Sequence, residues 1–221
     1  MKNMRFIAIS AMAAALFAAV SCGESQDSGF PDWAMTGFER PEGVNPVISP
    51  DSSKLFDCPM RGEAVAWEES DTFNPAAVTK DGKIVVLYRA EDNSATGIGQ
   101  RTSRIGYAES EDGLHFTKMD APVLYPGNDS QQELEVPGGC EDPRVAVTEN
   151  GTYVMLYTQW NRKQARLAVA TSEDLVHWEK HGPAFAKAYG GRFKDDFSKS
   201  ASIVTALKDG KLTIATIDGK Y

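Results

Sequence analysis

The feature that most constrains the fold is an internal repeat. Residues 73–89 and 141–158 each contain a short apolar segment, an Asp-Gly or Asn-Gly pair, and a second apolar segment that ends in Leu-Tyr. Such pairs between apolar segments indicate β-hairpins. Residues 104–116 then match residues 166–178 at a constant offset of 62. Each repeat therefore predicts about four strands.

Four-stranded units at this spacing are typical of β-propeller blades. A third unit begins at Ser202, and its Asp209-Gly210 turn lies 59 residues after the Asn150-Gly151 turn. Because a propeller needs at least about four blades to close, we expect an all-β fold that is an incomplete propeller fragment of about two and a half blades. The alternative is a two-sheet β-sandwich made from the 221 residues alone.

Composition narrows the function classes. The chain is 42% hydrophobic and 24% charged, which is an ordinary globular mixture, and its formal net charge is −8. A net anion without a basic run repels phosphate backbones, so no nucleic-acid partner is expected.

The first 21 residues are typical of an export signal. Lys2 and Arg5 precede an Ala-rich apolar stretch that is too short to span a bilayer as a helix. The stretch ends in Ala-Val-Ser-Cys-Gly, which resembles a bacterial lipobox, so Cys22 is the expected lipidation site. The alternative is an ordinary cleaved signal peptide. We expect a lipid-anchored protein of the bacterial envelope, with a tether and lead-in at residues 22–57 and the propeller domain at residues 58–221.

Two cysteines remain, Cys58 and Cys140, and the sequence leaves open whether they pair. No Cys/His metal-ligand spacing, phosphate loop or dinucleotide fingerprint is present, so neither a metal nor another cofactor is expected. The sequence does not specify an oligomeric state.

The strongest local motif is Gly-Gly-Cys-Glu-Asp-Pro-Arg at residues 138–144. It brings two acids and Arg144 to the start of an inner strand, where a propeller binds its ligand. Pro143 is expected to hold Asp142 extended. A carboxylate beside an arginine is either a tuned acid or a plain salt bridge.

The same repeat position one blade earlier is Asn74, which also precedes a proline. Two polar side chains at repeat-related inner positions are expected to converge on the propeller axis, as a polyhydroxylated ligand requires. Arg89, Glu91 and Asp92 end the following strand, and their alternative interpretation is a charged blade loop.

Other aromatic and imidazole side chains fall at repeat positions. His115 and His177 are repeat-equivalent and are therefore expected to be structural, which argues against a Ser-His-Asp triad. Phe116 and Trp178 are expected to pack within blades. Trp160 lies off the repeat, at a strand end, where it either stacks on a sugar or packs a loop.

Taken together, four segments resemble glycoside hydrolase family 130. They are Phe-Asn-Pro-Ala-Ala-Val from residue 73, Leu-Tyr-Arg-Ala-Glu-Asp from residue 87, Thr-Ser-Arg-Ile-Gly from residue 102, and Gly-Gly-Cys-Glu-Asp-Pro-Arg from residue 138. The resemblance implies a five-bladed propeller that cleaves β-mannosides with inversion. It implies that Asp142 is the general acid, and that Arg144 supports it. It places four residues against the mannose: Asn74, Arg89, Glu91 and Arg104.

The family contains phosphorylases, which use inorganic phosphate, and hydrolases, which use water. We expect a hydrolase, because an exported enzyme meets less phosphate than a cytoplasmic one and because Ser200 replaces an Asn that the phosphorylases carry. Lys199 keeps one positive charge of the phosphate site. The base carboxylates of the hydrolases fall beyond Tyr221, so the chain is expected to be inactive by itself. The alternatives are a β-mannoside phosphorylase and a non-catalytic glycan-binding lipoprotein.

Overall fold

The computed structural model describes residues 34, 37–97, 99–208 and 211–220. Contacts divide the chain into two units, Met1–Arg40 and Pro41–Tyr221, and the second unit holds the elements described below. The expected signal peptide and Cys22 lie outside the described residues. Within the described ranges, no helix combines the length and apolar character needed to cross a membrane.

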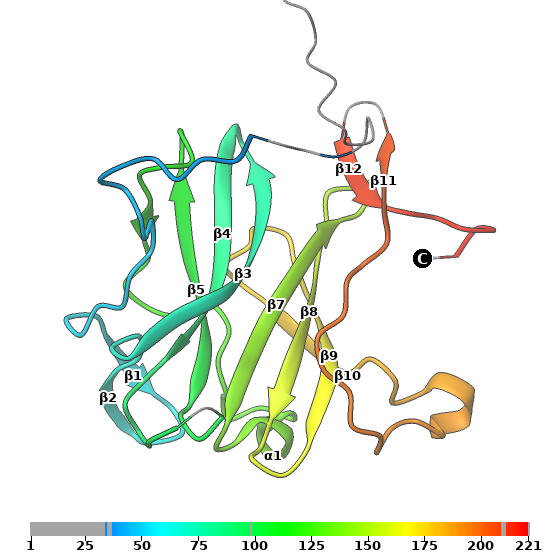
Figure 1. Cartoon of the computed structure of the whole chain (residues 1–221). Coiled ribbons are helices and arrows are strands. Elements are labelled where there is room, and N and C mark those ends of the chain that lie inside the picture. Colours follow the sequence, from blue (N-terminus) through cyan, green and yellow to red (C-terminus); the bar gives the residue numbers. More distant parts are fainter. Residues whose placement is uncertain (1–33, 35–36, 98, 209–210, 221) are drawn as a thin grey trace, which may run out of the picture. The chain divides into compact units, whose positions relative to one another are not determined.

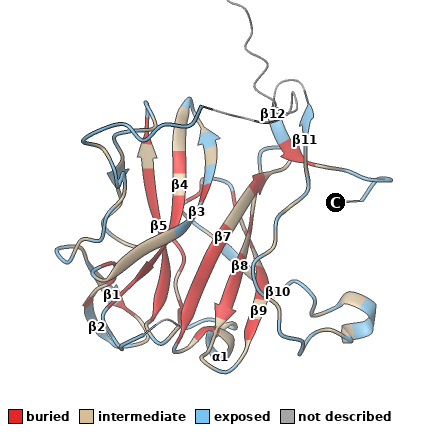
Figure 2. Ribbon diagram, in the orientation of Figure 1, coloured by how far each residue is buried: buried red, intermediate tan, exposed pale blue. Residues whose placement is uncertain are grey.

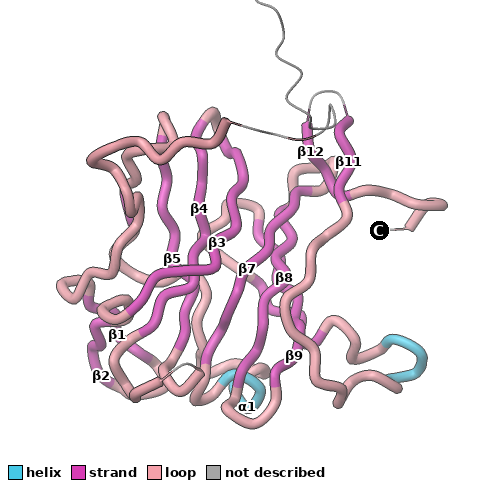
Figure 3. Tube along the Cα trace, in the orientation of Figure 1, coloured by secondary structure: helices cyan, strands magenta, loops and turns pink. Residues whose placement is uncertain are grey.

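The regular elements of the second unit are almost all strands, joined by long loops (Figures 1 and 3). Its first four-stranded unit consists of β3 (Asp71–Lys80), β4 (Lys83–Glu91), β5 (Ser103–Ser110) and β6 (Thr117–Lys118). The second consists of β7 (Gly139–Val147), β8 (Tyr153–Trp160), β9 (Ala165–Ser172) and β10 (Glu179–Pro183). In each unit every strand pairs antiparallel with the next one in the sequence, which confirms the predicted four-stranded repeat.

The remaining elements are short. They are the hairpin of β1 (Leu55–Cys58) and β2 (Glu63–Ala66), helix α1 (Gln132–Glu135), a 3₁₀ turn (Ala188–Gly191), and the hairpin of β11 (Thr205–Lys208) and β12 (Lys211–Ile214). The last hairpin is the predicted start of a third unit. Its Asp209-Gly210 turn lies outside the described residues.

The turn at the end of β3 shows why the hairpin prediction holds. Asp81 and Gly82 have φ angles of 50° and 78°. A two-residue hairpin turn with both central residues at positive φ matches the twist of the flanking strands, and Asp and Gly tolerate that conformation. The turn therefore sets the register in which Lys80 pairs with Lys83.

The two faces of the first blade are covered by two different cores. Along β4, Val85 and Leu87 pack into a core shared with the second blade, which contributes Met155 and Tyr157. The alternate residue Tyr88 packs against a second core that includes residues of β1 and β2. Side chains along a strand alternate between its two faces, so the middle of each blade is buried on both faces (Figure 2).

The inner strands β3 and β7 lie in contact with each other. The two blades are also joined where Ser103 of β5 and Gly139 of β7 form a parallel bridge. This arrangement is that of a propeller fragment: two blades plus the hairpin of a third, and the described strands do not form a closed ring.

The cysteines, the repeat-equivalent histidines and the repeat-equivalent aromatic residues lie as follows. Cys58 and Cys140 are both buried and both free. His115 and His177 each bind an aspartate three residues earlier in an exposed turn, at 2.7 and 2.6 Å, as expected for structural histidines. Phe116 and Trp178 pack against the two cores, which confirms their packing role.

Candidate active site

The inner strands of both blades are interrupted at the same repeat position. Register shifts occur between Phe73 and Ala76 in β3 and between Glu141 and Arg144 in β7, and each marks a β-bulge. Asn74 and Asp142 occupy these bulges with φ angles of 45° and 52°. The expectation that Asp142 is extended is therefore wrong: the bulge requires a left-handed residue, and Asn and Asp adopt that conformation more readily than other side chains.

The bulges turn the two side chains toward each other. Asn74 donates from Nδ2 to Oδ1 of Asp142 at 2.8 Å, across 68 residues of sequence. Ser200, which comes just before the third unit, also has a positive φ of 40°, and its hydroxyl lies 3.5 Å from Oδ2 of Asp142. The predicted convergence of the repeat positions is present in the structure, and Asp142 lies at its centre.

Arg89 holds the carboxylates together. Its guanidinium donates to Asp142 at 3.0 Å, to Glu141 at 2.9 Å and to Glu91 at 2.6 Å. Its Nε donates to the hydroxyl of Ser103 at 3.0 Å. Arg89 is 5% exposed, so its charge depends on these partners rather than on water.

Lys199 supplies the second positive charge. Its ammonium forms ion pairs with Glu141 and with Oδ2 of Asp142, the latter at 2.9 Å. Its side chain is 41% exposed, whereas that of Asp142 is 3% exposed. The cluster is therefore open on the Lys199 side, where a ligand can reach it.

These neighbours determine the protonation of Asp142. Burial raises the pKa of its carboxyl, but the hydrogen bonds from Asn74 and Lys199 and the charges of Arg89 and Lys199 outweigh burial and lower the pKa to about 2. Asp142 is therefore ionised at neutral pH in the unliganded protein, and it can donate a proton only when the charge around it changes.

Arg104 lies apart from this cluster. It donates to Asp92 at 2.9 Å and to the sulfur of Cys58 at 3.4 Å, and it is fully buried. The reason is the strand alternation of β5: Ser103 faces Arg89, so the next residue faces the opposite side of the blade. Arg104 joins the lead-in hairpin to the first blade.

Two further predicted residues lie near the cluster without contacting Asp142 through a hydrogen bond. Arg144 donates to the carbonyl groups of Pro75 and Pro143, at 3.2 and 2.8 Å. It therefore ties together, through their backbones, the bulge of Asn74 and the bulge of Asp142, the residue that it was expected to support. Trp160 donates to the carbonyl of Gly99 at 2.8 Å and packs edge-on against Phe197, so it fixes a loop.

The sequence reasoning missed Glu141, Ser103 and Ser200 as members of the cluster. Glu141 precedes Asp142 directly, and its signal was its place in the same motif. Ser103 carries no chemistry that distinguishes it in sequence, and Ser200 stood out only as the replacement of an Asn. The fold brings them to Arg89 and Asp142. Within the described part of the chain, no group of three or more His, Cys, Asp or Glu side chains is arranged to hold a metal ion.

Comparisons with known proteins agree with the resemblance of these motifs. Residues 41–221 match the profile of glycoside hydrolase family 130, described as beta-1,4-mannooligosaccharide phosphorylase. A curated relative, the 1,2-beta-oligomannan phosphorylase of Thermoanaerobacter sp. (strain X514), is 36% identical over 149 residues, which are 66% of this chain and 45% of that protein.

Two solved structures are similar over most of the chain. A putative glycosidase from Bacteroides thetaiotaomicron VPI-5482 is 74% identical, with a TM-score of 0.84, over 87% of this chain and 55% of that one. A second structure is 63% identical, with a TM-score of 0.84, over 86% of this chain and 53% of that one. It is described by the sentence "The GH130 family of mannoside phosphorylases contains glycoside hydrolases that target beta-1,2 mannosidic linkages in Candida mannan".

The chain thus spans about half the length of the proteins it matches. Its blades have the all-β fold of a five-bladed propeller, of which the described strands form an incomplete part.

Proposed function

Because the chain belongs to glycoside hydrolase family 130, we propose that it carries the acid side of an inverting enzyme that cleaves β-mannosides. The observation that supports this proposal is the convergence of Asn74, Arg89 and Lys199 on Asp142. Asp142 is the proposed general acid. Asn74, Arg89 and Glu91 are the groups proposed to bind sugar hydroxyls, and Glu141 is proposed to position Arg89 and Lys199.

The mannosyl group can be transferred to water or to inorganic phosphate. The sequence motifs favoured hydrolysis, but the family description and the curated relative are both named for phosphorolysis. The first candidate is therefore a β-mannoside phosphorylase.

The electrostatics of the cluster fit this choice. With a pKa of about 2, the Asp142 carboxyl carries no proton at neutral pH. A phosphate anion bound beside Lys199 would compete for its positive charge, and loss of that partner raises the pKa of Asp142. Phosphate would then both attack the sugar and favour the protonated acid.

Hydrolysis is the second candidate, and a specific observation favours it. The structure that is 63% identical to this chain is described with hydrolases that target β-1,2-mannosidic linkages. Lys199 and Ser200 are compatible with phosphate or with water as the attacking group, because an ammonium and a hydroxyl hydrogen-bond to both.

One experiment separates these candidates. The protein expressed from its complete reading frame is incubated with β-1,2- and β-1,4-mannobiose, with and without inorganic phosphate. Mannose 1-phosphate formed only with phosphate supports the phosphorylase, and free mannose formed without phosphate supports the hydrolase. Binding of mannooligosaccharides without turnover of either kind would support a non-catalytic glycan-binding protein. Turnover that is unchanged in an Asp142→Asn variant would contradict the proposed acid.

We also propose that the protein is exported and lipid-anchored through Cys22. The support is the sequence of residues 1–23, with its basic start, apolar stretch and lipobox-like end. Incorporation of labelled palmitate that disappears in a Cys22→Ser variant tests this proposal, and unchanged labelling in that variant would contradict it.

A further inference from the structure

Each blade contains a buried cluster of one tyrosine, one glutamate and one lysine. In the first blade, Tyr88 donates to Glu68 at 2.7 Å and Lys118 donates to the same carboxylate at 2.6 Å. In the second blade, Tyr157 donates to Glu135 at 2.8 Å and Lys180 donates to it at 2.5 Å. Both glutamates are 0% exposed.

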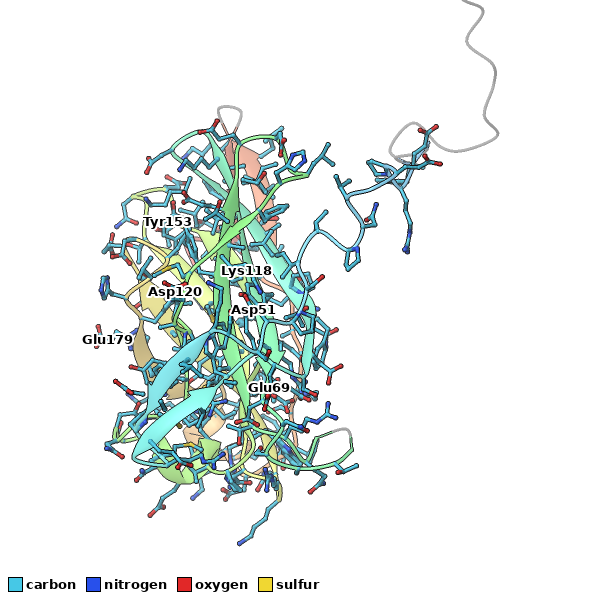
Figure 4. All side chains as sticks on the ribbon, turned by 90° about the vertical axis from the view of Figure 1, so that its left-hand side faces the viewer. Asp51, Glu69, Lys118, Asp120, Tyr153 and Glu179 are labelled. Atoms are coloured by element: carbon cyan, nitrogen blue, oxygen red, sulfur yellow. The ribbon has the colours of Figure 1, made fainter. Side chains whose placement is uncertain are left out.

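The two clusters occupy equivalent places in the repeat. The tyrosine ends the Leu-Tyr segment of the second strand, and the lysine lies on the fourth strand, at β6 or β10. Each lysine also donates to one backbone carbonyl of an earlier segment, Ser49 or Tyr125, both at 2.7 Å. Figure 4 labels Lys118 of the first cluster. The same contacts thus occur at equivalent positions in both blades.

The glutamates lie in the segments that lead into the inner strands. Glu68 comes six residues before Asn74, and Glu135 comes seven residues before Asp142. Both bulge residues of the candidate site therefore follow a glutamate that is anchored to the second and fourth strands of its own blade.

The path from Glu135 to Asp142 is itself fixed at intermediate points. Thr102 donates to the carbonyl of Pro137 at 2.9 Å, and the amide of Ser103 donates to the carbonyl of Gly138 at 2.8 Å. In the first blade, the amide of Ser70 donates to the carbonyl of Glu91 at 3.0 Å. Because these hydrogen bonds restrain the intervening backbone, a displacement of either glutamate is transmitted to the bulge residue that follows it.

We propose that the Tyr–Glu–Lys clusters are positioning devices that hold Asn74 and Asp142 in the places where they meet. The catalytic part of this inference rests on the proposed function; the geometric part does not. Burial raises the pKa of both Glu68 and Glu135, and each lysine and tyrosine opposes that rise. Each cluster therefore holds a buried carboxylate whose charged form depends on its donors, which for Glu135 also include Gln159 at 3.1 Å.

The test uses Tyr157→Phe in the protein from the complete reading frame. The matched control is Tyr107→Phe, which also removes a buried tyrosine's hydrogen bond to a glutamate, Glu109 at 2.9 Å, but outside either cluster. The first readout is the pKa of Asp142 from the ¹³C shift of its carboxyl group, which requires no turnover. We expect the pKa to move from about 2 toward the ordinary 3.8 in Tyr157→Phe and to stay in place in Tyr107→Phe.

The second readout is turnover of the substrate that the protein accepts. We expect kcat to fall about tenfold with little change in KM, because a small displacement of an acid lowers the rate more than it weakens binding. Lys180→Arg, which keeps the charge, should retain most of kcat, whereas Lys180→Met should not. Should Tyr157→Phe fail to fold, Tyr88→Phe tests the same relationship through Asn74.

The outcomes are distinct. A lower melting temperature with an unchanged Asp142 pKa and unchanged kcat would overturn the inference and leave the clusters as stabilising elements only. A shifted pKa in a protein that turns over no β-mannoside would support the positioning while contradicting the proposed function.

Discussion

Asn74 and Asp142 are joined by a 2.8 Å hydrogen bond, although 68 residues separate them in the chain. Both occupy the same position of the repeat, both precede a proline, and both have a positive φ. A residue in this conformation costs about 1–3 kcal/mol unless its side chain suits it. Asn and Asp suit this conformation, and the repeat places them so that the amide of one fixes the carboxylate of the other.

The first prediction removes that amide. In Asn74→Gly the backbone keeps its left-handed conformation, because glycine adopts positive φ without strain. The Asp142 carboxylate loses a donor that lowers its pKa, so we expect the pKa to rise from about 2 toward 3.8. Titration of the carboxyl by NMR measures the shift.

Asp81→Gly is the matched control for this substitution. Asp81 has a φ of 50° in an exposed turn, so the change alters the backbone in the same way away from the site. An equal pKa shift in both variants would contradict the role of the Asn74 amide.

The second prediction concerns stability against pH. The folded pKa of Asp142, about 2, lies below its ordinary 3.8, so the folded state favours the ionised form. Its contribution, about 2 kcal/mol, is present above pH 3.8 and is lost as the pH falls toward 2. Between pH 3.8 and pH 2, we expect the unfolding free energy to fall less steeply in Asp142→Asn than in the wild-type protein.

Urea unfolding at several pH values checks this expectation. Asp195→Asn serves as the control, because Asp195 belongs to an exposed ion pair with Lys194 and contributes little. A curve for Asp142→Asn that runs parallel to the wild-type curve between pH 4 and pH 2 would contradict the lowered pKa.

Sequence patterns predicted the blades and the meeting of Asn74 with Asp142, because both follow from a repeat. Once equivalent strands lie side by side around an axis, equivalent residues must face one another. The repeat did not reveal the left-handed conformation of Asp142. A proline restricts its preceding residue toward extended structure, and the bulge of β7 overrides that preference.

Arg104 shows a different limit. Its sequence neighbour Ser103 contacts Arg89, yet Arg104 pairs with Asp92 on the other face of β5. Adjacent residues of a sequence motif were expected to lie in one site, whereas adjacent side chains of a β-strand point to opposite faces of the sheet. The Tyr–Glu–Lys clusters were missed because Glu68 and Glu135 lie in lead-in segments of unequal spacing, although their tyrosine and lysine partners fall within the repeat.

The third prediction tests the open side of the site. Lys199→Met removes the exposed charge beside Asp142 while keeping a side chain of similar length. For a phosphorylase we expect the KM for phosphate to rise at least about tenfold, because charged hydrogen bonds to an anion contribute about 1.5–3 kcal/mol. Unfolding free energy should fall as well, because the buried carboxylates of Glu141 and Asp142 then depend on Arg89 for a compensating charge.

Lys194→Met is the control within the same segment. Lys194 pairs only with the exposed Asp195 among the described ion pairs, so the loss of its charge leaves the cluster intact. Phosphate dependence that is unchanged in Lys199→Met, or equally weakened in both variants, would exclude Lys199 from the acceptor site.

The last prediction concerns the glycine that starts β7. A Cβ atom at Gly139 would lie 2.1 Å from the carbonyl oxygen of Ser103, and the residue has a φ of 112°. The backbone of Ser103 cannot move aside easily, because its side chain binds Arg89 and its amide binds Gly138. Gly151, with a φ of 96°, meets nothing within 4 Å.

The two alanine variants therefore separate strain from collision. Gly151→Ala should cost about 1 kcal/mol for its positive φ. Gly139→Ala should cost about 3 kcal/mol, because overpacking is added to the same strain. Chemical unfolding of both variants measures the difference. Equal costs would mean that β5 and β7 can separate without loss, and that Gly139 does not hold the two blades together beside Asp142.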